Sequence, residues 1–133
     1  MNEPTLPEKK NLQALLLDDD EDILALLSSS LEPLGFTSIT SQNGSEALQL
    51  VQEHHIDLII SDLLIPDFNG LSFIRQILKQ PNPPPIIVIS GAMNYESVNT
   101  LISLGITEII AKPFEEKTLQ NSIQKILLKD SPS

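Results

Sequence analysis

The chain has 133 residues, a length typical of one domain, and 41% of them are apolar while only 4% are aromatic. It has no cysteine, which excludes disulfides and thiolate metal sites. The formal net charge of −10 disfavours direct nucleic-acid binding, because the 8 Lys and Arg residues are few and scattered. No apolar run approaches the ~20 residues of a membrane span, and the polar N-terminus is unlike a signal peptide. We therefore expect a cytoplasmic protein that does not contact membranes.

Five short apolar runs alternate with five stretches of helical periodicity. This alternation predicts an α/β fold with a doubly wound, parallel five-stranded sheet and right-handed crossovers. Residues 1–10 and 129–133 are expected to be tails that flank one domain at 11–128. The expected strands are 12–17, 36–40, 56–61, 86–90 and 107–111, and the expected helices lie within 23–31, 47–51, 71–78, 98–104 and 119–127.

Glycine, proline and capping residues mark the ends of these elements. Pro33 and Gly35 are expected to end the first helix, and Asn43 or Ser45 to cap the second. Gly70 follows the third strand, where we expect it to adopt a positive φ in a turn.

Polar residues stand where four of the expected strands end. Asp18 and Asp19 follow the first strand and Asp62 follows the third. Ser90 ends the fourth strand and Lys112 follows the fifth. Because the carboxyl ends of parallel strands meet at one edge of the sheet, we expect these five side chains to converge there.

The chemistry of this set points to phosphoryl transfer. Three close carboxylates repel one another unless a cation joins them, and Mg²⁺ binds one or two carboxylates together with phosphate oxygens. A carboxylate can attack phosphorus and form an acyl phosphate, while Lys112 and Ser90 can contact the transferred group. These residues predict a Mg²⁺-assisted phosphoryl acceptor with Asp62 as nucleophile.

Other acidic and basic residues have simpler explanations. Asp20, Glu21 and Asp22 continue the acidic run, and they favour the start of a helix. Asp57 lies at the opposite edge of the sheet, where we expect a structural role. The two histidines, at positions 54 and 55, are expected to be solvated at a helix C-terminus.

Four segments of the chain resemble the receiver domains of two-component response regulators, the CheY-like superfamily. They occur in the family's order and spacing, and the likeness runs from about Asn11 to Leu128. It implies a flavodoxin-like (βα)5 fold with strand order 2-1-3-4-5. The four segments are Leu16–Asp20, Asp57–Gly70, Ile87–Ala92 and Ala111–Phe114.

The resemblance implies a role for each matched position. Asp62 would accept a phosphoryl group from a histidine kinase or a histidine phosphotransfer protein. Ser90 and Lys112 would contact that group, and the bond from Lys112 to Pro113 would be cis.

The resemblance also implies a set of Mg²⁺ ligands. Asp19 and Asp62 would bind the ion directly, and Asp18 would assist through water. The backbone carbonyl of Leu64 would be a further ligand.

Phosphorylation would then alter the face made by the helix at 98–104, the strand at 107–111 and the helix at 119–127. The output would be a downstream protein effector, with the chain a monomer or a phosphorylation-dependent dimer. Such a receiver assists its own phosphotransfer and autodephosphorylation and is not a multiple-turnover enzyme.

The residues two places after Asp62 and Ser90 are Leu64 and Ala92, and neither can hydrogen-bond an attacking water, which favours a long-lived phosphoryl group.

Two other functions fit parts of the sequence. An aspartyl-nucleophile phosphatase would carry a second Asp two residues after the nucleophile, where this chain has Leu64. A phosphorylation-independent adaptor would not require all the site positions to be filled. A nucleotide-binding fold is disfavoured, because neither GxGxxG nor GxxxxGK[ST] occurs.

Overall fold

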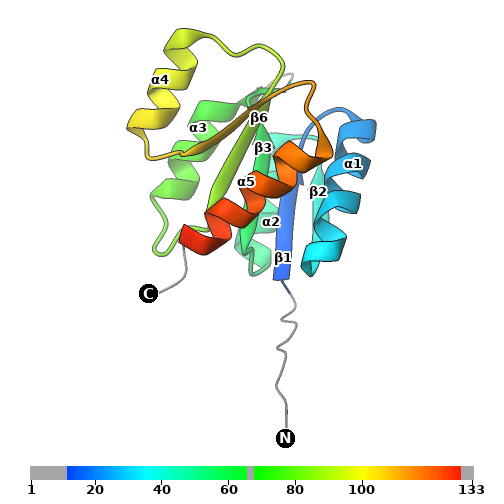
Figure 1. Ribbon diagram of the computed structural model, residues 1–133. Helices are drawn as coiled ribbons and strands as arrows, with labels where there is room; N and C mark the ends of the chain where they lie inside the picture. Colours follow the sequence, from blue (N-terminus) through cyan, green and yellow to red (C-terminus); the bar gives the residue numbers. More distant parts are fainter. Residues whose placement is uncertain (1–11, 66–67, 130–133) are drawn as a thin grey trace, which may run out of the picture.

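The computed structural model describes residues 12–65 and 68–129, which form a parallel sheet between two helical layers (Figure 1). The strand order is β2-β1-β3-β6-β7, and every neighbouring pair in this sheet is parallel. Counted among these five strands alone, this is the predicted order 2-1-3-4-5, so the flavodoxin-like architecture is confirmed. The strands are β1 (Leu12–Leu17), β2 (Phe36–Ser41), β3 (Leu58–Asp62), β6 (Ile86–Ser90) and β7 (Glu108–Ala111).

The helices divide between the two faces of the sheet. Helices α1 and α5 pack on one face, and α2, α3 and α4 pack on the other (Figure 1). None of the helices in the described part of the chain has the length and apolar character needed to cross a membrane. They are α1 (Glu21–Leu31), α2 (Gly44–Glu53), α3 (Gly70–Leu78), α4 (Tyr95–Ser103) and α5 (Glu116–Lys129), and a 3-10 turn at Glu32–Leu34 follows α1.

Aliphatic side chains on both faces of the central strands form the core. Successive residues of β1 point to opposite faces, so Leu16 packs under α1 and α5 while Leu15 and Leu17 pack under the other helices. Strands β3 and β6 are buried along their whole length. This double burial explains why their sequences are nearly continuous apolar runs.

Asparagine side chains begin three of the helices. Asn43 caps α2 by accepting a hydrogen bond from the Glu46 amide. It is one of the two capping residues that we predict for this helix. Asn69 and Asn94 cap α3 and α4 in the same way. These asparagines in the loops therefore fix where α2, α3 and α4 start.

The third strand begins at Leu58, two residues later than predicted. The Asp57 carboxylate instead accepts hydrogen bonds from the Gln13 amide and from the exposed His55 ring, and the Asp57 amide donates to the Gln13 carbonyl. These contacts tie the end of the loop to β1, so Asp57 has the structural role expected of it. Both histidines are exposed, as predicted.

Two further differences concern short elements. Residues Leu64–Ile65 (β4) and Phe68–Asn69 (β5) form a small antiparallel pair that the sequence did not predict. Helix α5 continues to Lys129, the first residue of the expected C-terminal tail. The predictions for residues 1–10 and 130–133 concern segments outside the described residues.

The prediction of a positive φ at Gly70 is wrong. The described glycines with positive φ are Gly35 and Gly105, and both follow a helix. Gly70 is required for a different reason, because a Cβ atom there would lie 2.6 Å from the backbone oxygen of Leu63. The close approach holds the start of α3 against the loop that follows β3.

We predict that Gly70→Ala destabilises the fold by about 1–3 kcal/mol, because backbone atoms must move to admit the methyl group. Gly91→Ala is the matched control, since its Cβ would lie 3.8 Å from the nearest atom, Lys112 Cβ. The measurement is urea unfolding of both variants. Equal unfolding midpoints would contradict the close approach.

Candidate functional site

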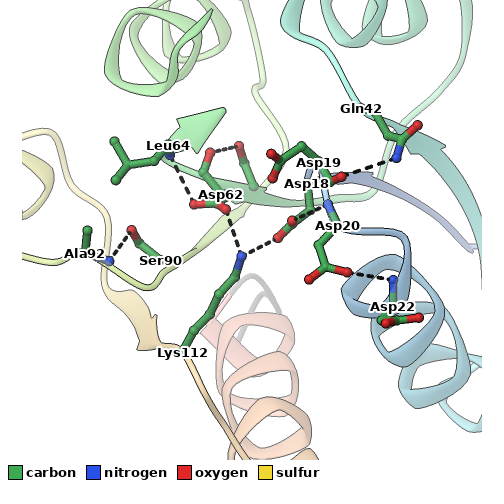
Figure 2. Close-up of polar contacts among 11 residues, drawn as sticks. Asp18, Asp19, Asp20, Asp22, Gln42, Asp62, Leu64, Ser90, Ala92 and Lys112 are labelled. Atoms are coloured by element: carbon green, nitrogen blue, oxygen red, sulfur yellow. Dashed lines mark hydrogen bonds and ion pairs between the residues drawn. The ribbon is translucent and has the colours of Figure 1, made fainter. Parts of the chain in front are cut away.

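The carboxyl-terminal edge of the sheet gathers the five predicted side chains (Figure 2). Asp62 ends β3 and Ser90 ends β6, while Asp18 and Asp19 follow β1 and Lys112 follows β7. One carboxylate oxygen from each of the three aspartates lies within 4.8 Å of the others. The predicted convergence of the three acids is therefore present in the fold.

The Lys112 ammonium group bridges two of these acids. Its Nζ lies 2.8 Å from Asp62 Oδ2 and 2.8 Å from Asp18 Oδ2 (Figure 2). The backbone amide of Lys112 also donates to the Ser90 carbonyl, at 2.9 Å. The peptide bond between Lys112 and Pro113 is cis, as the family resemblance implied.

Backbone amides hold the reactive oxygens in place. The Leu64 amide donates to Asp62 Oδ1 at 3.1 Å, and the Asp20 amide donates to Asp18 Oδ1 at 2.9 Å. The Ser90 hydroxyl oxygen accepts from the Ala92 amide at 3.3 Å, which leaves its proton to be donated elsewhere. Each of these three side chains is thus oriented by the loop that follows its own strand.

Burial makes the charge of this site costly. Asp18 is 0% exposed, Asp62 is 4% exposed and Ser90 is 0% exposed. Burial raises the pKa of Asp18, and the Lys112 ammonium and the Asp20 amide offset that rise only in part. Burial alone would lower the pKa of Lys112, but its contacts with Asp18 and Asp62 together raise it. The lysine therefore stays charged while Asp18 resists ionisation.

The donor atoms suit a hard divalent cation. Asp18 Oδ2 is buried without an aligned hydrogen-bond donor, although the Lys112 ammonium lies 2.8 Å away. Asp19 is exposed, so solvent can reach the cluster of three carboxylates from its side. Carboxylate oxygens with open access to water are the surroundings that Mg²⁺ favours. The predicted use of the Leu64 carbonyl stays a prediction.

Two contacts of the site were missed from the sequence. Lys112 was expected opposite a phosphoryl group, and its simultaneous contact with Asp18 was not foreseen. Gln42, in the loop after β2, donates from Nε2 to the Asp19 carbonyl at 3.4 Å. Gln42 follows an edge strand, and that position was the only signal that could have placed it at the site.

The raised pKa of Asp18 makes the stability of the metal-free protein depend on pH. The native state holds the Asp18 proton more tightly than the unfolded chain does, so the contribution of Asp18 to stability falls as pH rises through and above 3.8. Asp18→Asn does not titrate. In EDTA, we therefore expect the free energy of unfolding of Asp18→Asn minus that of the wild type to increase with pH.

Urea unfolding across this pH range measures that difference. A constant difference in the free energy of unfolding between the two proteins does not affect the test. The prediction concerns only the sign of the change in that difference with pH. A flat difference, or one that decreases with pH, would contradict the assignment.

Comparisons with known proteins agree with the fold. The family model described as the response regulator receiver domain matches residues 14–124. The chemotaxis response regulator CheY4 of Vibrio cholerae has 28% sequence identity and a TM-score of 0.79, over 88% of this chain and 99% of that chain. A signal receiver domain of an HD domain-containing protein from Pseudomonas fluorescens Pf-5 has 26% identity and a TM-score of 0.82, over 90% and 97%.

Two relatives are named as regulators of transcription. The "Transcriptional regulatory protein CpxR homolog" of Haemophilus influenzae is 36% identical over 120 residues, which are 90% of this chain and 52% of that protein. The "Probable transcriptional regulator ycf27" of Cyanidium caldarium is 34% identical over 119 residues, 90% of this chain and 47% of that protein. This chain thus spans about half the length of these relatives. By its family match and its fold, the chain belongs to the response regulator receiver domain family of two-component signalling.

Proposed function

We propose that this receiver domain accepts a phosphoryl group on Asp62 with the help of Mg²⁺. One observation carries the proposal, namely that three carboxylates lie within 4.8 Å of one another beside the Lys112 ammonium. The donor would be the phosphohistidine of a histidine kinase or of a histidine phosphotransfer protein. A Mg²⁺ ion bound by Asp18, Asp19, Asp62 and the Leu64 carbonyl would neutralise charge on the transferring group.

Two contacts that orient the Asp62 carboxylate support its proposed role as nucleophile. The Leu64 amide and the Lys112 ammonium each hold one of its two oxygens. In the transfer, a carboxylate oxygen of Asp62 attacks phosphorus, the new O–P bond forms and the P–N bond to the donor histidine breaks. The electron pair of that bond returns to the imidazole of the donor.

Lys112 and Ser90 would respond to the product. A phosphoryl group adds about −1.5 to −2 charge at the end of β3, and the Lys112 ammonium is close enough to pair with it. The Ser90 hydroxyl can donate to a phosphoryl oxygen. Because the Lys112 amide is bonded to the Ser90 carbonyl, a shift of either residue moves the ends of β6 and β7 together. This movement would alter the face of α4, β7 and α5, where a protein effector or a second copy would bind.

The proposed reaction is stoichiometric rather than catalytic turnover of a substrate. A phosphatase would need an acid or base beside the nucleophile, and the corresponding residue here, Leu64, is a 58% exposed apolar side chain. The names of the relatives, which are regulators of transcription, are partly at odds with our expectation of no direct nucleic-acid binding. We propose that these 133 residues act through protein contacts, since their net charge of −10 repels a phosphate backbone.

We predict that acetyl phosphate and Mg²⁺ add one phosphoryl group per chain and that Asp62→Asn takes up none, because the amide is not nucleophilic. Intact-mass measurement follows the addition, and EDTA should prevent it. Asp57→Asn is the matched control, since Asp57 lies at the opposite edge of the sheet and should leave uptake unchanged. Uptake that persists in Asp62→Asn would falsify the choice of acceptor.

The surroundings of Asp62 predict a long-lived phosphoryl group, with a half-life of minutes or more in Mg²⁺. Leu64 and Ala92 offer no side-chain group that could orient a water for attack. Leu64→Asn should shorten the half-life, because an amide can hold such a water. Leu128→Asn, at a 74% exposed leucine on α5, is the control and should not change it. A wild-type half-life of seconds would rule out this effect of the apolar side chains.

A further inference from the structure

A concave surface lies beside the receiver site. Helix α1, the end of β2 and the start of α2 enclose a groove of about 550 Å³. Leu24 and Ala25 form its apolar part, and Ser28 and Thr40 contribute hydroxyl groups. None of the phosphoryl-acceptor residues lines it, so this groove requires an explanation of its own.

Two carboxylates face this groove without a cationic partner. Glu21 comes from the first turn of α1 and Glu46 from the first turn of α2. No Lys, Arg or His is among the lining residues. Across residues 12–65 and 68–129, the ion pairs join His55 to Asp57 and Lys112 to two aspartates, and none uses either glutamate. The groove therefore carries negative charge that the two helix N-termini favour but that no cationic side chain among the described residues neutralises.

The carboxylate of Glu46 is held in position. Its Oε1 lies 2.9 Å from the hydroxyl of Ser41, a buried residue of β2, which shares its one proton between Glu46 and the Asn43 carbonyl at 2.8 Å. The Glu46 amide is bonded to the capping side chain of Asn43. A carboxylate fixed in this way can receive a cationic donor with little further loss of side-chain entropy.

We propose that this groove binds an arginine side chain of a protein partner. The apolar stem would lie on Leu24 and Ala25, and the guanidinium group would reach the glutamates at the rim. Arginine fits this combination because a long apolar stem carries a planar group with several donors. A divalent ion fits less well, because the described cluster of three acids able to hold a metal is Asp18, Asp19 and Asp62, outside the groove.

This proposal does not depend on phosphorylation. The net charge of −10 steers basic partners toward the whole surface, and the groove adds a shape that selects where one side chain is bound. Gln42 lines the groove and also donates to the Asp19 carbonyl. A side chain bound in the groove would therefore lie next to the loop that carries Asp19. Failure of the proposed phosphoryl transfer would leave the groove and its charge unchanged.

The test is a titration of the ¹⁵N-labelled wild-type chain with N-acetyl-arginine amide, followed by amide chemical shifts. Saturable shifts are expected at Ala25, Ser28 and Gln42. N-acetyl-glutamine amide, which has a polar head without charge, should produce none at the same ionic strength. Absence of localised, saturable shifts with the arginine probe would overturn the proposal.

Variants separate a specific site from general attraction. Glu21→Gln with Glu46→Gln should weaken binding by about tenfold or more, as expected for lost charge-assisted hydrogen bonds. Glu32→Gln with Glu53→Gln removes the same charge at exposed positions outside the groove and should leave affinity nearly unchanged. Equal weakening by both pairs would assign the binding to long-range attraction and overturn the site.

A third variant tests the shape of the groove. Ala25→Phe keeps both carboxylates and fills the apolar part, so it should abolish the localised shifts. Ala25 is exposed, which lets the larger side chain be accommodated without disturbing the core. Unchanged binding in Ala25→Phe would show that the stem does not lie in the groove, and would overturn the proposal.

Discussion

Two buried carboxyl groups, those of Asp18 and Asp62, share the Lys112 ammonium at distances of 2.8 Å. Removing such charges from water is expensive, and one ammonium group compensates them incompletely. The raised pKa of Asp18 records this deficit, since burial outweighs the attraction of Lys112. The edge of the sheet is therefore built for additional positive charge, and the exposed Asp19 carboxylate keeps it open to solvent.

Much of this arrangement could be predicted from the sequence because strand ends in a parallel sheet share one edge. Apolar runs buried on both faces located β3 and β6, and their last residues, Asp62 and Ser90, fell at that edge. The same reasoning placed Asp18 after β1 and Lys112 after β7. These positions required only the spacing of strands and helices, so they were insensitive to errors of one or two residues at element ends.

The rest depended on contacts between segments distant in the chain. The carboxylate of Asp57 accepts a hydrogen bond from the amide of Gln13, 44 residues away. The chain at Asp57 is therefore a loop tied to β1, and the third strand starts two residues later than expected. Gly70 was expected to adopt a positive φ, but the backbone of Leu63 requires the absence of a side chain there. The bridge from Lys112 to Asp18 likewise depends on the distance between loops, which periodicity does not encode.

The net charge at the carboxyl-terminal edge of the sheet bears on the valence of the metal ion that would suit it. The three carboxylates of Asp18, Asp19 and Asp62, when ionised, and the Lys112 ammonium together carry two negative charges. A divalent ion brings the group to electroneutrality, whereas a monovalent ion leaves it anionic and a trivalent lanthanide makes it cationic. The valence of an ion bound as proposed would thus set the net charge of this edge, and a lanthanide would leave an excess positive charge that attracts anions from solution.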